Sequence, residues 1–225
     1  MEEKKFVQFK KDELEMREFV KNSLGKGRIS NVTVEYTPVG EKIIVATNKP
    51  GIVIGTKGER IEELTAVLKK KFGLENPHVE ILEITKPEFD AQLTADDIAL
   101  ALERLGSIKF KIVAYKMLQR IMDAGALGVE IVLAGKLPSE RAKTWRFSQG
   151  YLKKIGESSS IVNRAEARAD TMMGTIGIKV SILPPDAKIE DQIDVTDKVI
   201  NDIKLNKLKA GEQNDNKAKR NKKHE

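Results

Sequence analysis

The sequence predicts a mixed fold of the α/β type, more closely α+β, with two domains and a C-terminal tail. Three observations predict it. The chain has 225 residues, which exceeds one average domain. Apolar residues recur along it at helical spacing in some segments and at strand spacing in others. Breaks at Pro87 and Pro184 divide it. We therefore expect domains over 1–86 and 87–183, followed by a tail over 184–225.

The first domain alternates between helical and strand-like segments. Apolar residues at helical spacing predict a helix over 12–24. Alternation of apolar and polar residues then predicts three strands, over 32–36, 43–46 and 79–84. Between the second and third strands, apolar residues recur at three- and four-residue steps after Gly58. They predict an amphipathic helix that ends at Gly73.

The second domain is predicted to pack two helices on a four-stranded, mainly antiparallel sheet. The helices are expected over 94–104 and 107–123. The strands are expected over 129–133, around Trp145 and Phe147, over 164–170 and over 176–182. Pro184-Pro185 ends the domain.

The tail begins with acidic and apolar residues and ends in a basic, polar run. A weakly helical stretch is expected over 195–208, and the run at 217–223 is too polar to bury a core. We expect this end of the chain to be a disordered, basic extension.

Composition and charge narrow the class of function. There are 40 Lys and Arg against 34 Asp and Glu, a net charge of +6 that favours an anionic partner. The absence of cysteine excludes disulfides and thiolate metal sites. With only two histidines, the chain has few side chains suited to acid–base catalysis near neutral pH. We expect no cofactor, no metal and no enzymatic activity. No apolar run suits a membrane span or a signal peptide, so a cytoplasmic location is expected.

The segment 52–61 carries the most specific signal. An apolar run meets Gly55-Thr56-Lys57-Gly58, and an amphipathic helix follows at once. The two glycines let a nucleic-acid backbone approach, Lys57 adds a cation, and the helix N-terminus adds free N–H groups. The RNA-binding residues expected here are Ile54, Gly55, Thr56, Lys57, Gly58 and Arg60. The alternative is a plain turn between two helices.

Basic residues are also dense in the middle third of the chain, over 104–120 and 136–154. Cations beside aromatic residues are typical of sites that follow an RNA backbone, although Trp145 itself is more typical of a core. The alternative is an ordinary solvated face. The RNA-binding residues expected here are Lys109, Lys111, Lys116, Arg120, Lys136, Arg141, Lys143, Arg146, Lys153 and Lys154.

The order helix, strand, strand, G-x-x-G, helix, strand resembles a type II KH domain. A wider resemblance rests on five segments, at 49–55, 71–77, 135–142, 150–154 and 174–180. Together they are similar to protein three of the small ribosomal subunit, the universal S-three family, in its archaeal form. The resemblance implies a ribosome-bound protein of the subunit head. Its implied partners are small-subunit ribosomal RNA, messenger RNA at the channel by which it enters, and head proteins ten and fourteen, with no membrane.

One turn departs from the family. The resemblance implies basic residues facing messenger RNA in the turn at 122–128, where this chain has Asp123 and Leu127. Neither side chain holds phosphate. A role in opening messenger duplexes is therefore not expected from this turn, unless Arg120 or the segment 136–143 replaces it.

Three functions were weighed on the sequence. A structural ribosomal RNA-binding protein explains both domains. A free-standing KH regulator of messenger or small RNA explains only the first domain. A nuclease or lyase would need clustered carboxylates or an activated nucleophile, and the acidic residues are instead scattered among lysines. The sequence favours the first.

Overall fold

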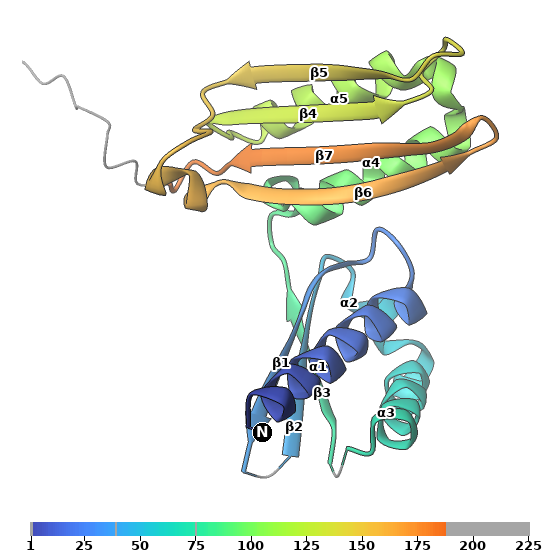
Figure 1. Ribbon diagram of the computed structural model, residues 1–225, viewed down its shortest axis with the longest axis vertical. Helices are drawn as coiled ribbons and strands as arrows, with labels where there is room; N and C mark the ends of the chain where they lie inside the picture. Colours follow the sequence, from blue (N-terminus) through green and yellow to red (C-terminus); the bar gives the residue numbers. More distant parts are fainter. Residues whose placement is uncertain (1, 39, 75, 188–225) are drawn as a thin grey trace, which may run out of the picture. The chain divides into compact units, whose positions relative to one another are not determined.

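The fold was analysed in a computed structural model that describes residues 2–38, 40–74 and 76–187. These residues contain two β-sheets, each packed against its own helices (Figure 1). The predicted mixed fold class is confirmed. The division at residue 87 stays a prediction, because residues 1–187 together form one compact unit. The tail predicted over 184–225 lies almost wholly outside the described residues.

The N-terminal part contains a three-stranded sheet in the order β1-β2-β3. Its elements are α1 (Glu2–Leu24), β1 (Ile29–Thr37), β2 (Gly40–Thr47), α2 (Pro50–Ile54), the 3-10 turn η1 (Thr56–Gly58), α3 (Glu59–Phe72) and β3 (His78–Glu83). Strand β2 pairs antiparallel with β1 and parallel with β3. A parallel pair needs a crossover connection, and α2 and α3 provide it.

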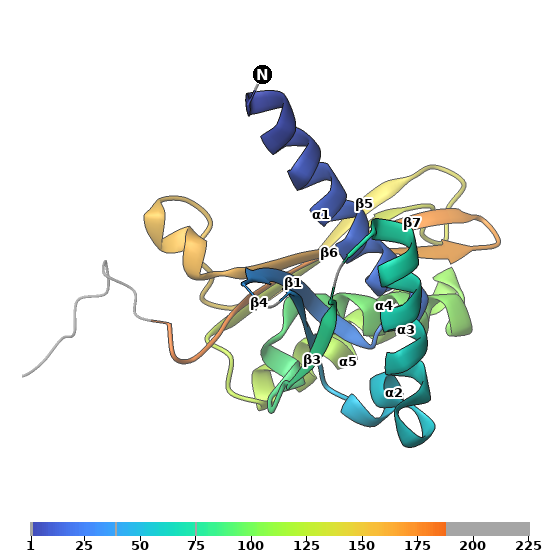
Figure 2. The same cartoon turned by 90° about the horizontal axis from the view of Figure 1, so that it is seen from below.

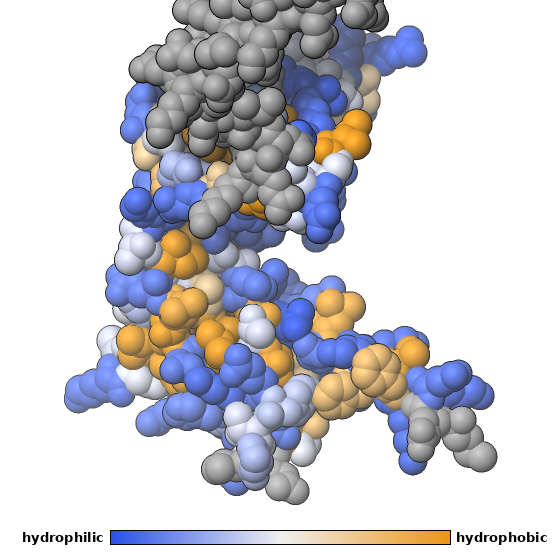
Figure 3. Space-filling model, turned by 90° about the vertical axis from the view of Figure 1, so that its left-hand side faces the viewer, coloured by the Kyte–Doolittle hydropathy of each residue, from blue (hydrophilic) through white to orange (hydrophobic). Residues whose placement is uncertain are grey.

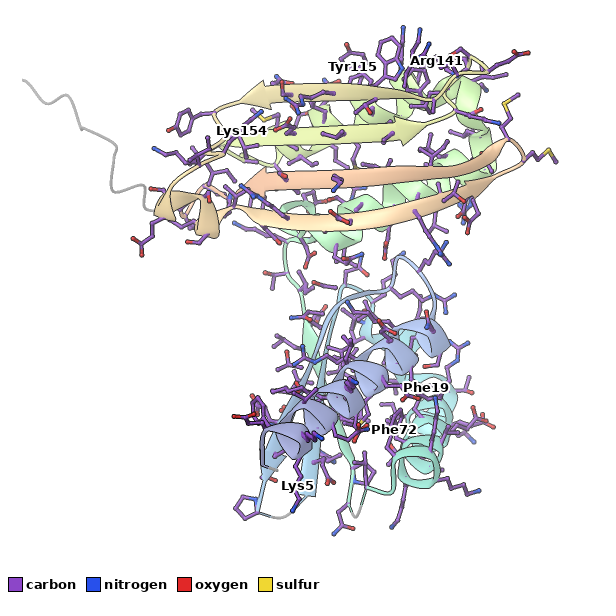
Figure 4. The ribbon with its side chains drawn as sticks, in the orientation of Figure 1. Lys5, Phe19, Phe72, Tyr115, Arg141 and Lys154 are labelled. Atoms are coloured by element: carbon purple, nitrogen blue, oxygen red, sulfur yellow. The ribbon has the colours of Figure 1, made fainter. Side chains whose placement is uncertain are left out.

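The core of this part lies between the sheet and its helices. Val32, Ile43 and Val45 from the sheet are fully buried, as are Val53 of α2 and Leu68 of α3. On the outside of this core, α1 and α3 meet through two aromatic rings, Phe19 and Phe72, whose centroids are 6.1 Å apart (Figure 4).

The C-terminal part contains a four-stranded sheet in the order β5-β4-β7-β6, antiparallel throughout. Its elements are η2 (Pro87–Phe89), α4 (Ala91–Leu105), η3 (Ser107–Lys109), α5 (Phe110–Asp123), β4 (Gly128–Gly135), β5 (Lys143–Gly150), η4 (Glu157–Ile161), β6 (Asn163–Thr171) and β7 (Gly174–Leu183). Helices α4 and α5 lie on the same face of the sheet (Figure 1).

Alternation along the strands places one apolar row against these helices. Ile131 and Ile178 face Leu102 and Phe110 in one buried cluster. Asp90 fixes the start of α4, because its carboxylate accepts hydrogen bonds from the backbone N–H of Gln92 at 2.9 Å and of Leu93 at 3.3 Å. Strand β7 ends immediately before Pro184, as the sequence predicts.

The main difference from the predicted elements is the length of the first helix. Helix α1 begins at Glu2, whereas the apolar pattern predicts a start at residue 12. Phe6 and Val7 are exposed, so the first turns of α1 bury no continuous stripe that periodicity could detect. On the side of the molecule shown in Figure 3, hydrophobic and hydrophilic side chains lie next to one another on the surface.

A buried carboxylate on α1 predicts a pH dependence of stability. Glu13 is bonded by Lys10 Nζ at 2.7 Å and by Arg17. Above all, the hydrogen bond from Lys10 holds the pKa of Glu13 below its usual range. The charged form is thus favoured in the folded state. Its contribution is complete above the unfolded pKa, about 4.3, and is lost as pH falls through the lower folded pKa.

Glu13→Gln is therefore expected to lower the free energy of unfolding at neutral pH. The difference from wild type should shrink as the pH is taken below about 4. Urea unfolding curves recorded at several pH values measure it. A difference that stays constant with pH would contradict this account of Glu13.

Candidate nucleic-acid interface

The G-x-x-G segment forms the loop that joins α2 to α3 (Figure 2). Its backbone is left-handed at three positions, with φ of 74° at Gly55, 55° at Lys57 and 88° at Gly58. Within the described residues, Lys57 is the one non-glycine residue with positive φ. This geometry turns the chain sharply and leaves the side chains of Thr56 and Lys57 exposed.

The two glycines are needed for different reasons. A Cβ on Gly55 would lie 3.0 Å from Cβ of Arg60, so both space and backbone conformation favour glycine there. A Cβ on Gly58 would meet nothing within 4 Å, so at this position only the backbone conformation favours glycine. Gly58 is also the N-cap of α3 and has no side chain that occupies the helix N-terminus. The N–H of Glu59 donates to the carbonyl oxygen of Thr56, and the N–H groups that follow it in the first turn of α3 have no side-chain cap, which suits phosphate oxygens.

Beside this loop lies a hollow of about 640 Å³ lined by Ile52, Arg60, Glu59 and Glu63. The guanidinium of Arg60 donates to the carbonyl oxygen of Ile52 at 3.0 Å, which ties α3 to α2. The two glutamates make the hollow partly acidic, a feature that reasoning on the glycines alone missed. Cationic attraction at this loop therefore comes from Lys57 rather than from the hollow.

The bases predicted on and before α5 lie in different surroundings. Lys109 and Lys116 are exposed at the start and middle of the helical region. The ammonium of Lys111 lies over the Trp145 ring, 4.8 Å from its centroid. Arg120 pairs with Glu88 at 2.9 Å, and its hydrogen bond lowers the pKa of that carboxyl. Arg120 is thus partly neutralised.

The bases predicted over 136–154 do not share one surface. Lys136 and Arg141 lie in the connection between β4 and β5, and Lys153 in the connection after β5. On β5, Lys143 and Arg146 are an odd number of residues apart, so their side chains leave opposite faces of the sheet. Figure 4 shows Arg141 and Tyr115 at one end of this sheet and Lys154 toward the other.

A buried acid missed at the sequence level organises part of this region. Glu130 on β4 is 9% exposed and binds Arg146 Nε at 2.7 Å and Lys154 Nζ at 2.9 Å. Its position on the face opposite to Val129 and Ile131 follows from strand alternation, but the partners do not.

The aromatic residues near these bases belong mainly to the core. Trp145 packs on Phe110 with ring centroids 5.4 Å apart, and Phe147 is buried against the same ring. Tyr115 contacts Phe147 edge-on at 5.1 Å and is itself exposed. Among these four aromatic residues, Tyr115 is therefore the best placed to stack on a base.

Other types of site find less support in the described ranges. Those residues bring together no group of three or more histidine and acidic side chains that could hold a metal ion. None of the helices described here is long and apolar enough to cross a membrane.

Comparison with known proteins agrees with this architecture. The KH domain family matches residues 15–89, and the family described as "Ribosomal protein S3, C-terminal domain" matches residues 98–182. A KH domain followed by this second domain defines an RNA-binding protein of the ribosomal class.

Relatives extend the likeness over most of the chain. The small ribosomal subunit protein uS3 of Methanocaldococcus jannaschii is 40% identical over 86% of this chain and 92% of its own. The corresponding protein of Methanococcus aeolicus is 36% identical over 88% of this chain and 94% of its own. The chain belongs to the uS3 family, whose members are structural constituents of the small ribosomal subunit. The resemblance stated from the sequence, including its archaeal type, is confirmed.

Proposed function

We propose that this protein binds ribosomal RNA in the head of the small subunit, ribosome-bound in the cytoplasm, and lines the path by which messenger RNA enters. One observation carries the RNA-binding part. The left-handed loop over 55–58 presents glycine backbone and Lys57 at the N-terminus of α3, which has no side-chain cap. Lys57 and the N–H groups of α3 attract an anion there, against the opposing charge of Glu59 and Glu62 in the first turn of α3.

The bases of the C-terminal part supply further phosphate contacts in this proposal. Lys109, Lys116 and Arg141 are exposed cations from separate elements. Ribosomal RNA folds back on itself, so one protein can hold several of its segments through backbone contacts at scattered points. Head proteins ten and fourteen are proposed neighbours on family resemblance.

In this proposal Arg120 contacts messenger RNA, in place of the basic residues that the family resemblance implies in the turn after α5. The turn after α5 has exposed Asp123 and partly exposed Leu127 instead of cations. Arg120 lies one helical turn earlier but is paired with Glu88. Because that pair is partly exposed, phosphate can compete for Arg120. A photo-crosslinker at residue 124 of reconstituted subunits should react with messenger RNA; failure to do so would remove the messenger contact.

The alternative, a free-standing KH regulator, is not favoured, because the family match includes the second domain. Sedimentation of cell extract on a density gradient separates the two functions. The chain should travel with small subunits and be absent from the light fractions.

Replacing Arg141, Lys143 and Arg146 with alanine is expected to flatten the salt dependence of RNA binding. Each single-strand phosphate contact adds about 0.7 to the slope of log affinity against log salt, so three lost contacts remove roughly two units. Fluorescence anisotropy with fragments of ribosomal head RNA, at several salt concentrations, measures the slope. An unchanged slope would mean that these three side chains are ordinary solvated cations with no contact to RNA.

A further inference from the structure

The four-stranded sheet has one face that neither α4 nor α5 covers (Figure 1). The strand registers arrange its outward side chains in rows that run across β5, β4, β7 and β6. The first row is Ser148, Glu130, Ser181 and Arg164. The second is Arg146, Val132, Lys179 and Glu166. The third is Thr144, Ala134, Gly177 and Arg168.

The third row is the low part of this outer face. Ala134 and Gly177 are exposed, and a Cβ added to Gly177 would have its nearest neighbour, the Ala134 carbonyl oxygen, 3.8 Å away. A ligand can therefore lie close to the sheet backbone. Val132 is the one sizeable apolar side chain in the three rows, so the face lacks the buried apolar anchor that protein partners use.

The outer face is rich in cations. The basic side chains of the rows, joined by Lys154 from the loop after β5, outnumber the two carboxylates of the rows and Asp170 further along β6: Arg146, Lys154, Arg164, Arg168 and Lys179 against Glu130, Glu166 and Asp170. A hollow of about 340 Å³ over β7 and β6 is lined by four side chains that can donate hydrogen bonds, Lys154, Arg164, Lys179 and Ser181, and by the two carboxylates of the rows, Glu130 and Glu166.

The two carboxylates have different surroundings. Glu166 is 73% exposed and pairs with Lys179, which is 67% exposed, so this pair is screened and opens easily. Glu130 is only 9% exposed, and it binds two cations whose side chains are more than half exposed. A single buried acid thus holds Arg146 and Lys154 in place while leaving their other N–H groups directed to solvent.

We propose that this outer face binds the sugar–phosphate backbone of RNA, and that Glu130 is a positioning residue for Arg146 and Lys154. The inference rests on the proposed RNA-binding function but concerns a surface other than the G-x-x-G loop. Guanidinium, ammonium and hydroxyl donors beside the low third row match phosphate oxygens. A polyanion also needs no apolar pocket.

The first test compares two removals of one negative charge. Simple electrostatics predicts that Glu130→Gln and Glu166→Gln both strengthen RNA binding. Positioning by Glu130 instead predicts that Glu130→Gln weakens binding about threefold to tenfold. Each carboxylate oxygen of Glu130 binds one of the two cations, and the amide replaces one of these oxygens with an NH₂ group, which donates and cannot bind a cation. Glu166→Gln should leave binding unchanged or tighter. The readout is anisotropy with fragments of ribosomal head RNA, on variants whose thermal unfolding is cooperative. Equal or tighter binding by Glu130→Gln would overturn the positioning role.

The second test leaves Glu130 intact and so does not depend on that variant folding. Arg164→Gln with Lys179→Gln should reduce the salt slope of RNA binding by roughly 1.4 units. The matched control is Lys4→Gln with Lys5→Gln, which removes the same charge from exposed positions on α1 and should leave the slope unchanged. Equal slopes for both pairs would overturn the site.

Two further outcomes separate this inference from its alternatives. Poly-aspartate binding that depends on Arg164 and Lys179, with RNA binding unchanged, would overturn it in favour of an acidic protein partner. A wild-type chain that binds none of the RNA fragments would overturn the proposed function itself. RNA binding that survives loss of Arg164 and Lys179 but not changes at Gly55 and Gly58 would overturn this inference alone.

Discussion

Gly128→Ala is expected to lower the free energy of unfolding by about 3 kcal/mol, the upper end for overpacking a closely packed site. A Cβ on Gly128 would lie 1.9 Å from the carbonyl oxygen of Tyr151 and 2.4 Å from its carbonyl carbon. Both are backbone atoms. They cannot turn aside as a flexible side chain would, so the β4–β5 pairing must shift. Urea denaturation measures the loss.

A control substitution lies in the same sheet. Gly177→Ala adds the same methyl group on β7, where the nearest atom is 3.8 Å away. Its effect should stay within about 0.5 kcal/mol, as for ordinary exposed positions. Equal effects at Gly128 and Gly177 would show that glycine is required for strand conformation in general rather than for this close approach.

Gly55→Asp with Gly58→Asp is expected to weaken RNA binding at least about tenfold relative to Gly55→Asn with Gly58→Asn, a difference of about 1.4 kcal/mol. Both pairs introduce the same strain at positive φ and the same crowding near Arg60. Only the aspartates add negative charge where phosphate approaches the N-terminus of α3. The comparison therefore isolates electrostatics from conformation.

Anisotropy with ribosomal head RNA measures this difference, and circular dichroism checks that both variants fold. If the aspartate and asparagine variants bind equally, the charge at the loop does not matter and the proposed phosphate contact there is wrong. If both bind as wild type, the loop makes no contact with RNA at all.

Most of the fold could be predicted because buried apolar residues recur at regular intervals along most of its helices and strands. In β7, Ile176, Ile178 and Val180 alternate with exposed residues, and the structure confirms that strand. The first turns of α1 could not be predicted, since Phe6 and Val7 are exposed and leave no apolar period. Propensity alone is a weak guide where tertiary packing does not set a pattern.

The candidate site was less predictable than the fold. The loop geometry at 55–58 follows from glycine chemistry, because positive φ costs other residues about 1–2 kcal/mol. The grouping of bases did not follow, because proximity along the chain hides which face of a strand a side chain occupies. Counting the residues between Lys143 and Arg146 would have separated them. No sequence signal pairs Glu130 with Lys154, since tertiary folding brings them together.

The parallel pairing of β2 with β3 has a consequence for synthesis of the chain. The G-x-x-G loop lies inside the crossover between these strands, so its geometry depends on β3, which ends at Glu83. At about 5–20 residues per second, β3 is completed roughly one to five seconds after the loop has been made. Closing such a long connection carries an entropic cost that only the finished strand pairing offsets. A nascent chain that stops before residue 78 is therefore expected not to bind RNA through this loop. Unfinished chains are thereby kept from occupying sites on assembling subunits.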